Sequence, residues 1–73
     1  MKKLSLAMNG EKGRIAAING DARFCNRVTS IGLTIGSVIE VIQNQKARPV
    51  LVYGRDTMIA INRRECEKII LEV

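Results

Sequence analysis

The segment Ser30–Ser37, SIGLTIGS, places Gly32 and Gly36 four residues apart in an apolar run that ends on a hydroxyl. Closely spaced glycines before a hydroxyl are part of the phosphate-binding loop, in which backbone amides at a helix N-terminus and a lysine hold the anion. Here the spacing is one residue short, no lysine follows Gly36, and the expected helix precedes the glycines. The segment is therefore not predicted to bind phosphate.

Metal-ligating and nucleophilic side chains are few and scattered. The chain has no histidine, and its two cysteines, Cys25 and Cys66, do not have the paired spacing of zinc ligands. The nearest approach to a carboxylate group is Glu65, Glu67 and Glu72, and no serine or cysteine stands beside an evident base. We predict no catalytic residue, no metal and no cofactor, and we expect both cysteines to be reduced core residues.

The length of 73 residues indicates a single domain over residues 1–73. A domain of this size buries only about 60% of the surface of its unfolded chain, so a catalytic cleft would remove volume that the core needs. No signal peptide is visible, and no apolar run approaches the length of about 18 residues that a membrane helix needs. The sequence predicts a cytoplasmic binding module rather than an enzyme, without membrane insertion.

Charge favours an acidic partner. Twelve lysines and arginines against seven acidic residues give a net charge of +5, which suits nucleic acid, an anionic membrane surface or an acidic protein face. No basic run is longer than two residues, whereas a surface that follows phosphates usually gathers its cations on one face. Nucleic-acid binding is therefore an alternative and not the first prediction.

Short runs of β-branched residues, separated by Gly, Asn, Asp and Pro, predict five strands. The runs are Arg14–Asn19, Ser37–Gln43, Pro49–Tyr53, Thr57–Asn62 and Ile69–Val73. The tripeptide Gly54-Arg55-Asp56 between the third and fourth runs predicts a tight hairpin. Closing so small a sheet into a bent antiparallel barrel removes most of its exposed edge.

Two interruptions are predicted to be helical. Asp21 is a natural N-cap for the segment Ala22–Ile31, whose apolar residues share one face. That face carries Phe24, Cys25, Val28 and Ile31. Asn62–Glu65 has the form of a capping box and predicts one helical turn before the last strand. The predicted fold class is all-β, a five-stranded antiparallel barrel with one short helix between its first two strands.

The glycines of SIGLTIGS fit structural roles. If Gly32 has the left-handed conformation after a helix, Val28 and Leu33 are the hydrophobic pair of a Schellman motif. Gly36 then suits the third position of a type II turn over Thr34–Ser37, where φ must be positive.

The order and spacing of three motifs resemble one known family over Leu4–Val73. The first motif has the form L-x5-G-x2-G-x-I-x2-I, the second is the helix that ends in IGLTIGS followed by VIEV, and the third is INRRECEKIILEV. The chain is thereby identified as similar to FeoA, a small accessory protein of ferrous iron transport. The chain departs from the family pattern at Ile31 and Ile35, where leucine and proline are usual.

The resemblance implies an SH3-like barrel and an interaction role in a family associated with transition metal ions. Family members accompany a membrane GTPase permease for ferrous iron and bind its cytoplasmic part, which implies a position at the inner face of the membrane through that partner. A similar module occurs in metal-dependent transcription repressors, so a metal-responsive regulatory domain is a further alternative. Homo-oligomerisation stays open.

A partner-binding surface is expected on the helix and the corner after it. Arg23 and Arg27 lie one turn apart on the solvent face, and Leu33 and Ile35 flank the two glycines. An apolar knob beside two cations is common at protein interfaces. Alternatively, the arginines are only solvated and the two apolar side chains only cover the barrel end. The chain has too few aromatic residues for the groove that reads proline-rich peptides.

Overall fold

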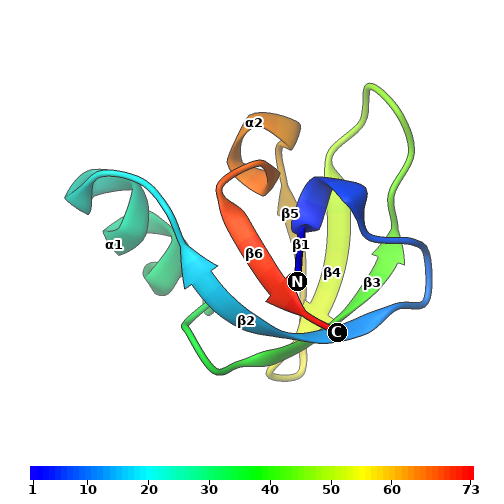
Figure 1. Cartoon of the computed structure of the whole chain (residues 1–73), viewed down its shortest axis with the longest axis horizontal. Coiled ribbons are helices and arrows are strands. Elements are labelled where there is room, and N and C mark those ends of the chain that lie inside the picture. The colour runs from blue at the N-terminus through cyan, green and yellow to red at the C-terminus, as the bar shows by residue number, and fades with distance from the viewer.

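Six strands form one antiparallel sheet in the order β1-β6-β2-β3-β4-β5, in a computed structural model that describes all residues from Met1 to Val73 (Figure 1). The strands are β1 (Lys2–Lys3), β2 (Lys12–Ile18), β3 (Val38–Gln43), β4 (Val50–Gly54), β5 (Thr57–Ile61) and β6 (Ile69–Glu72). The helices are η1 (Leu4–Leu6), a 3₁₀ turn, α1 (Ala22–Ser30) and α2 (Arg63–Cys66). The predicted all-β class, with a helix between two strands and a helical turn before the last strand, is confirmed.

The strand count differs from the prediction by one. β1 was missed because Lys2–Lys3 shows no apolar alternation, which is the signal that identifies a strand in a sequence. Its pairing is set from the far end of the chain, since Lys2 lies opposite Leu71 and Lys3 opposite Ile70. The two termini therefore lie close together (Figure 1).

Two irregularities in the ladder bend the sheet. The register between β2 and β6 shifts between Ile15 and Ala17, and the register between β3 and β4 shifts between Val41 and Gln43. An extra residue on one strand of a pair increases the local twist and bends that strand. The sheet therefore curls around a single core.

The core is one cluster of buried side chains from β2, β3, β4, β5 and β6, from the three helical segments and from two loop positions. It comprises Leu4, Ala7, Ile15, Phe24, Val28, Leu33, Ile39, Val41, Val50, Val52, Ile59, Ile61, Cys66, Ile69 and Leu71. Along β4 and β5, inward residues alternate with outward ones, as expected for strands with one buried face. Helix α1 contributes only Phe24 and Val28, so it covers one end of the barrel and stands to the side of the sheet (Figure 1).

The predicted N-caps are present. The N–H of Phe24 donates to Asp21 Oδ1 at 2.8 Å, and the N–H of Glu65 donates to Asn62 Oδ1 at 3.1 Å. The second half of the predicted capping box is wrong, because the Glu65 side chain does not reach back to Asn62. It forms an ion pair with Arg27 of α1 instead, which joins the two helices.

The predicted hairpin between β4 and β5 is confirmed as a two-residue turn. Gly54 lies opposite Thr57, and the turn residues Arg55 and Asp56 have φ of 54° and 60°. Positive φ at both positions is the requirement of a type I′ turn, whose twist matches that of the flanking strands. Neither residue is the glycine that this conformation favours, so the turn carries backbone strain.

Candidate interaction surface

The corner after α1 is built by the first of the two glycines. Gly32 has a φ of 107° and ends the helix. Its N–H donates to the Thr29 carbonyl at 3.0 Å, and the Leu33 N–H donates to the Val28 carbonyl at 3.1 Å. These are the two hydrogen bonds of the predicted Schellman motif. The motif reverses the chain and aims Leu33 back toward the helix.

The second glycine closes the predicted type II turn. Gly36 has a φ of 94°, and the Ser37 N–H donates to the Thr34 carbonyl at 3.0 Å. The same turn is tied to β2 because the Gly36 N–H donates to the Ile15 carbonyl and the Ile15 N–H donates to the Ser37 carbonyl, both at 2.8 Å. The corner is therefore held by backbone hydrogen bonds on both sides of Ile35.

The two apolar residues between the glycines face opposite ways. Leu33 is 0% exposed and belongs to the core, whereas Ile35 is 66% exposed. The prediction that Leu33 contacts a partner needs correction, because its side chain is sealed against Val28 and the rest of the core by the Schellman geometry. Ile31, expected on the buried face of the helix, is 43% exposed because the helix ends there and the chain turns away.

The two predicted cations lie on the solvent side of α1. Arg23 is exposed and makes no side-chain hydrogen bond or ion pair. Arg27 pairs with Glu65, and the two side chains are 58% and 13% exposed respectively. Arg27 is therefore an anchor of α1 that still presents part of its charge to solvent. Lys68 makes a cation–π contact with Phe24 of α1, because its Nζ lies 4.9 Å from the ring centroid.

The structure thus leaves four side chains at this end of the barrel that are exposed and could meet a partner. We call them the corner surface: Arg23, Arg27, Ile31 and Ile35. Ile31 is the member that sequence reasoning missed. Two signals in the sequence were available: Ile31 follows Arg27 by four residues, which places it on the solvent side of the helix, and it directly precedes the glycine that ends the helix.

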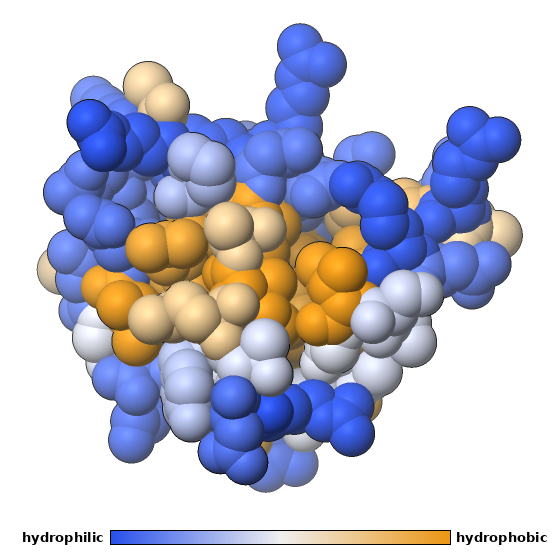
Figure 2. All heavy atoms as spheres, turned by 180° about the vertical axis from the view of Figure 1, so that it is seen from behind, coloured by the Kyte–Doolittle hydropathy of each residue, from blue (hydrophilic) through white to orange (hydrophobic).

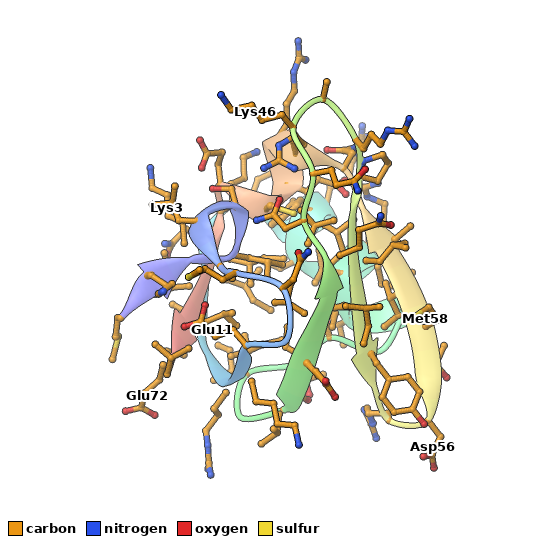
Figure 3. All side chains as sticks on the ribbon, turned by 90° about the vertical axis from the view of Figure 1, so that its right-hand side faces the viewer. Lys3, Glu11, Lys46, Asp56, Met58 and Glu72 are labelled. Atoms are coloured by element: carbon orange, nitrogen blue, oxygen red, sulfur yellow. The ribbon has the colours of Figure 1, made fainter.

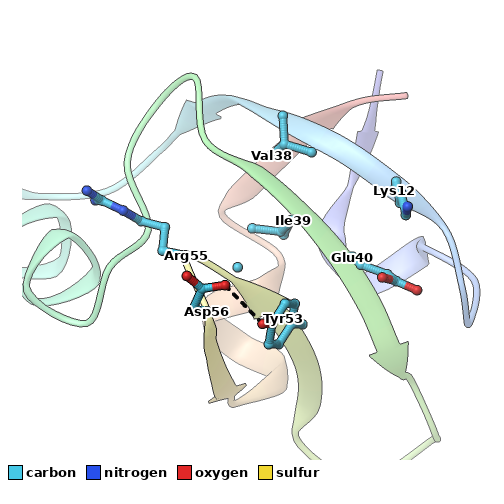
Figure 4. A pocket seen from close by; sticks show the side chains of 8 residues that line it. Lys12, Val38, Ile39, Glu40, Tyr53, Arg55 and Asp56 are labelled. Atoms are coloured by element: carbon cyan, nitrogen blue, oxygen red, sulfur yellow. Dashed lines mark hydrogen bonds between the residues drawn. The ribbon is translucent and has the colours of Figure 1, made fainter.

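A second feature lies on the outer face of the sheet, around Tyr53 (Figure 4). An open depression of about 300 Å³ is lined by Lys12, Val38, Ile39, Glu40, Tyr53, Gly54, Arg55 and Asp56. The Tyr53 hydroxyl donates to Asp56 Oδ1 at 3.2 Å, and this bond to a carboxylate raises the pKa of the phenol. The depression mixes two cations with two carboxylates, so its charges oppose one another instead of converging on one ligand.

Candidate metal ligands do not converge. No group of three or more His, Cys, Asp or Glu side chains lies close enough together to hold an ion. Cys66 is 0% exposed, and burial raises the pKa of its thiol to about 11, so the nucleophilic thiolate is disfavoured. Cys25 is half-buried, and both cysteines are free thiols. No helix has the length and apolar character to cross a bilayer.

Taken together, the six-stranded curled sheet, the helix at its end and the exposed corner define a small SH3-like barrel. The chain belongs to the FeoA family, since the model of the FeoA domain matches residues 2–73. It is 35% identical over 72 residues to a protein of Methanocaldococcus jannaschii provisionally named Fe(2+) transport protein A, covering 99% of this chain and 87% of the relative. The family is linked to ferrous iron transport.

Solved structures share the fold over most of the chain. A crystal structure of an iron uptake regulatory protein, FeoA, superposes with a TM-score of 0.90 at 25% identity, covering 94% of this chain and 92% of that one. The FeoA of Stenotrophomonas maltophilia, crystallised with zinc and described as a prokaryotic SH3 domain protein, gives 0.78 at 15% identity, covering 94% and 87%. At that identity the second likeness shows the fold alone.

Proposed function

We propose that this protein is a non-catalytic accessory module of ferrous iron uptake that binds the cytoplasmic part of a membrane GTPase permease through the corner surface. Membership of the FeoA family supports the iron-uptake setting. The observation that carries the binding site is Ile35, which is 66% exposed at the tip of a turn that backbone hydrogen bonds fix on both sides. The module works in the cytoplasm and reaches the membrane through its partner.

The corner surface has the composition of a small interface. Ile31 and Ile35 supply exposed apolar area, and Arg23 and Arg27 supply two exposed cations on the helix that leads into the corner. Arginine with apolar anchors is enriched at interface centres. Because the turn is already ordered, little conformational entropy is lost when a partner covers it. The cations favour an acidic patch on the permease, which also speeds association.

The experiment is a binding titration of the purified protein against the cytoplasmic GTPase domain of the permease from the same organism. Ile35→Asp places a charge in the centre of the surface and is expected to weaken binding at least ten-fold. Arg23→Glu is expected to weaken it several-fold, with a loss that shrinks at high salt. Unchanged affinity in both variants would refute the corner surface as the docking site.

Arg27 needs a matched control because it also anchors α1. Arg27→Glu would break its ion pair with Glu65 and place two carboxylates together, so lost binding could reflect a displaced helix. Glu65→Gln removes the ion pair and leaves the cation in place. If Arg27 acts at the interface, Glu65→Gln keeps the affinity and Arg27→Gln lowers it.

A further inference from the structure

β5 ends the sheet without a neighbour on its outer side. The strand order places β4 on one side of β5 and nothing on the other, and Figure 3 shows β5 at the margin of the molecule with no ribbon beyond it. The closing pair of a two-residue hairpin is hydrogen-bonded, so Thr57, Ile59 and Ile61 turn their backbone groups toward β4. The N–H and C=O groups of Met58 and Ala60 therefore face outward.

This edge lacks the features with which natural proteins protect an exposed strand. The residues of β5 carry no charge and no proline, and the β4–β5 ladder has no bulge. The other end of the sheet shows the contrast, because β1 is two residues long and both are lysines. Such a difference between two edges of one sheet marks β5 as the edge that can accept another strand.

The side chains beside the edge are apolar. On the outer face, Tyr53 lies opposite Met58 and Leu51 lies opposite Ala60, and Met58 is 56% exposed. Met58 lies at the outer margin of β5 (Figure 3). This side of the molecule faces the viewer in Figure 2, which shows apolar atoms gathered inside a polar rim. Alternate side chains of an added strand would pack against Met58 and Ala60.

Unpaired cations stand near both ends of β5. Arg48 lines a depression of about 300 Å³ together with Ala60, Arg55 sits in the hairpin, and Arg64 lies in α2 directly after the strand. None of the three guanidinium groups forms an ion pair or donates a hydrogen bond within the chain. The one carboxylate in the hairpin, Asp56, accepts a hydrogen bond from Tyr53.

We propose that the free edge of β5 binds an extended peptide segment as a seventh strand, with apolar side chains over Met58 and Ala60 and acidic residues at both ends. Charge complementarity selects this occupant over a second copy of the chain, because a second copy also carries a net charge of +5 and brings arginines to the same places. The binding groups belong to β5 and its flanking arginines and include no residue of the corner surface, and the site does not depend on the permease.

The test uses a defined probe, the synthetic nonapeptide Asp-Asp-Thr-Val-Thr-Val-Thr-Asp-Asp. Titrated into ¹⁵N-labelled protein, it is expected to shift the amide signals of Met58 and Ala60 and to slow their hydrogen exchange. Replacing its four aspartates by lysines should weaken binding at least ten-fold. N-methylating either its valines or its threonines blocks one of its two edges, so only one of these peptides should lose binding.

Variants of the protein test the same edge. Ala60→Pro removes one outward N–H from the edge, a change that an edge strand tolerates. Because the peptide then loses a backbone partner, it should no longer slow hydrogen exchange at the Met58 amide. Should that variant unfold, Met58→Lys places on the edge the kind of charged side chain that normally protects an edge strand, and it should weaken binding at least ten-fold. Ile35→Asp is the matched control and should bind the peptide as the parent does, which separates this site from the proposed permease contact.

Three results would overturn the proposal. The first is no amide shift at millimolar peptide. The second is a set of shifts centred on Arg23 and Ile35 instead of β5. The third is a doubled mass in sedimentation without peptide that Ala60→Pro returns to the monomer, which would make a second copy the occupant of the edge.

Discussion

Leu33 and Ile35 lie two residues apart in the sequence and have opposite environments, so truncating each to alanine gives a matched pair of perturbations. Leu33 is 0% exposed, and replacing a buried leucine by alanine typically costs about 2–5 kcal/mol, because a cavity is left as well as transfer energy lost. Ile35 is 66% exposed, and surface substitutions usually change the free energy of unfolding by less than about 0.5 kcal/mol. We therefore expect the free energy of unfolding to fall at least about 1.5 kcal/mol further in Leu33→Ala than in Ile35→Ala.

The measurement is urea unfolding followed by circular dichroism. A domain of this length has a stability of about 4–11 kcal/mol, so a mid-range loss of about 3 kcal/mol in Leu33→Ala should leave a folded but weakened protein. With a urea slope of about 1–3 kcal/mol per molar, a loss of about 3 kcal/mol moves the midpoint down by about 1–3 M. Ile35→Ala should leave the midpoint nearly unchanged while it lowers affinity for the permease domain.

Equal losses in the two variants would refute the opposite orientation of the two side chains. A loss above about 1.5 kcal/mol in Ile35→Ala alone would show that the turn tip supports the fold and is not a free contact. The slope of the transition is a built-in control, since a changed slope would mean that a variant alters the unfolded ensemble or breaks two-state behaviour.

Three further predictions concern the turns and the titration of the protein. Gly36→Ala should lower the free energy of unfolding by about 1–2 kcal/mol through backbone strain alone, because nothing lies within 4 Å of the position of the added Cβ. Gly36→Asn should cost less, because asparagine adopts positive φ more readily than alanine. Urea unfolding measures both costs, and equal costs would contradict backbone conformation as their cause. Replacing Arg55-Asp56 by Asn-Gly should raise the melting temperature, since both positions have positive φ and this dipeptide is favoured in type I′ turns; a lower melting temperature would show that Tyr53 depends on its bond to Asp56. The Met8 N–H and Lys2 lower the pKa of Glu11 from 4.5 in the folded protein, so the ionised carboxylate stabilises the fold above pH 4.5, and this stabilisation is lost as the pH falls through the lowered, folded-state pKa. The difference in the free energy of unfolding between the parent and Glu11→Gln should therefore close below about pH 4.5. A difference that stays constant in acid would contradict this linkage.

Local patterns predicted most of the fold because each acts within a few residues. The caps at Asp21 and Asn62 and the two glycine turns depend on side chains and φ values that a short segment determines by itself. β1 could not be predicted, because two lysines become a strand only through pairing with residues near the other end of the chain. The capping box failed for the same reason: Glu65 had a local partner and also a distant one, Arg27, and the ion pair between the helices prevailed.

The candidate site was predicted in part, and the residue that failed shows what limits such reasoning. The Schellman pattern already paired Leu33 with Val28, which implies a buried side chain, whereas placing Leu33 at an interface treated both apolar residues between the glycines alike. The apolar surface on the exposed face of β4 and β5 was not predicted from the sequence, for another reason. It exists only when the register sets Tyr53 beside Met58, and register is a property of two strands together.

The two proposed surfaces offer different physical groups and should therefore tolerate different changes. The corner surface offers side chains on a turn that backbone hydrogen bonds hold at Gly36 and Ser37, so a single charge at Ile35 can abolish its contact while conservative apolar changes preserve it. The β5 edge offers unpaired backbone groups that any extended segment can meet, so its selectivity must come from Met58 and the flanking arginines. Substitutions that change only side-chain charge should affect the rate of binding at both surfaces, but a proline should affect only the edge.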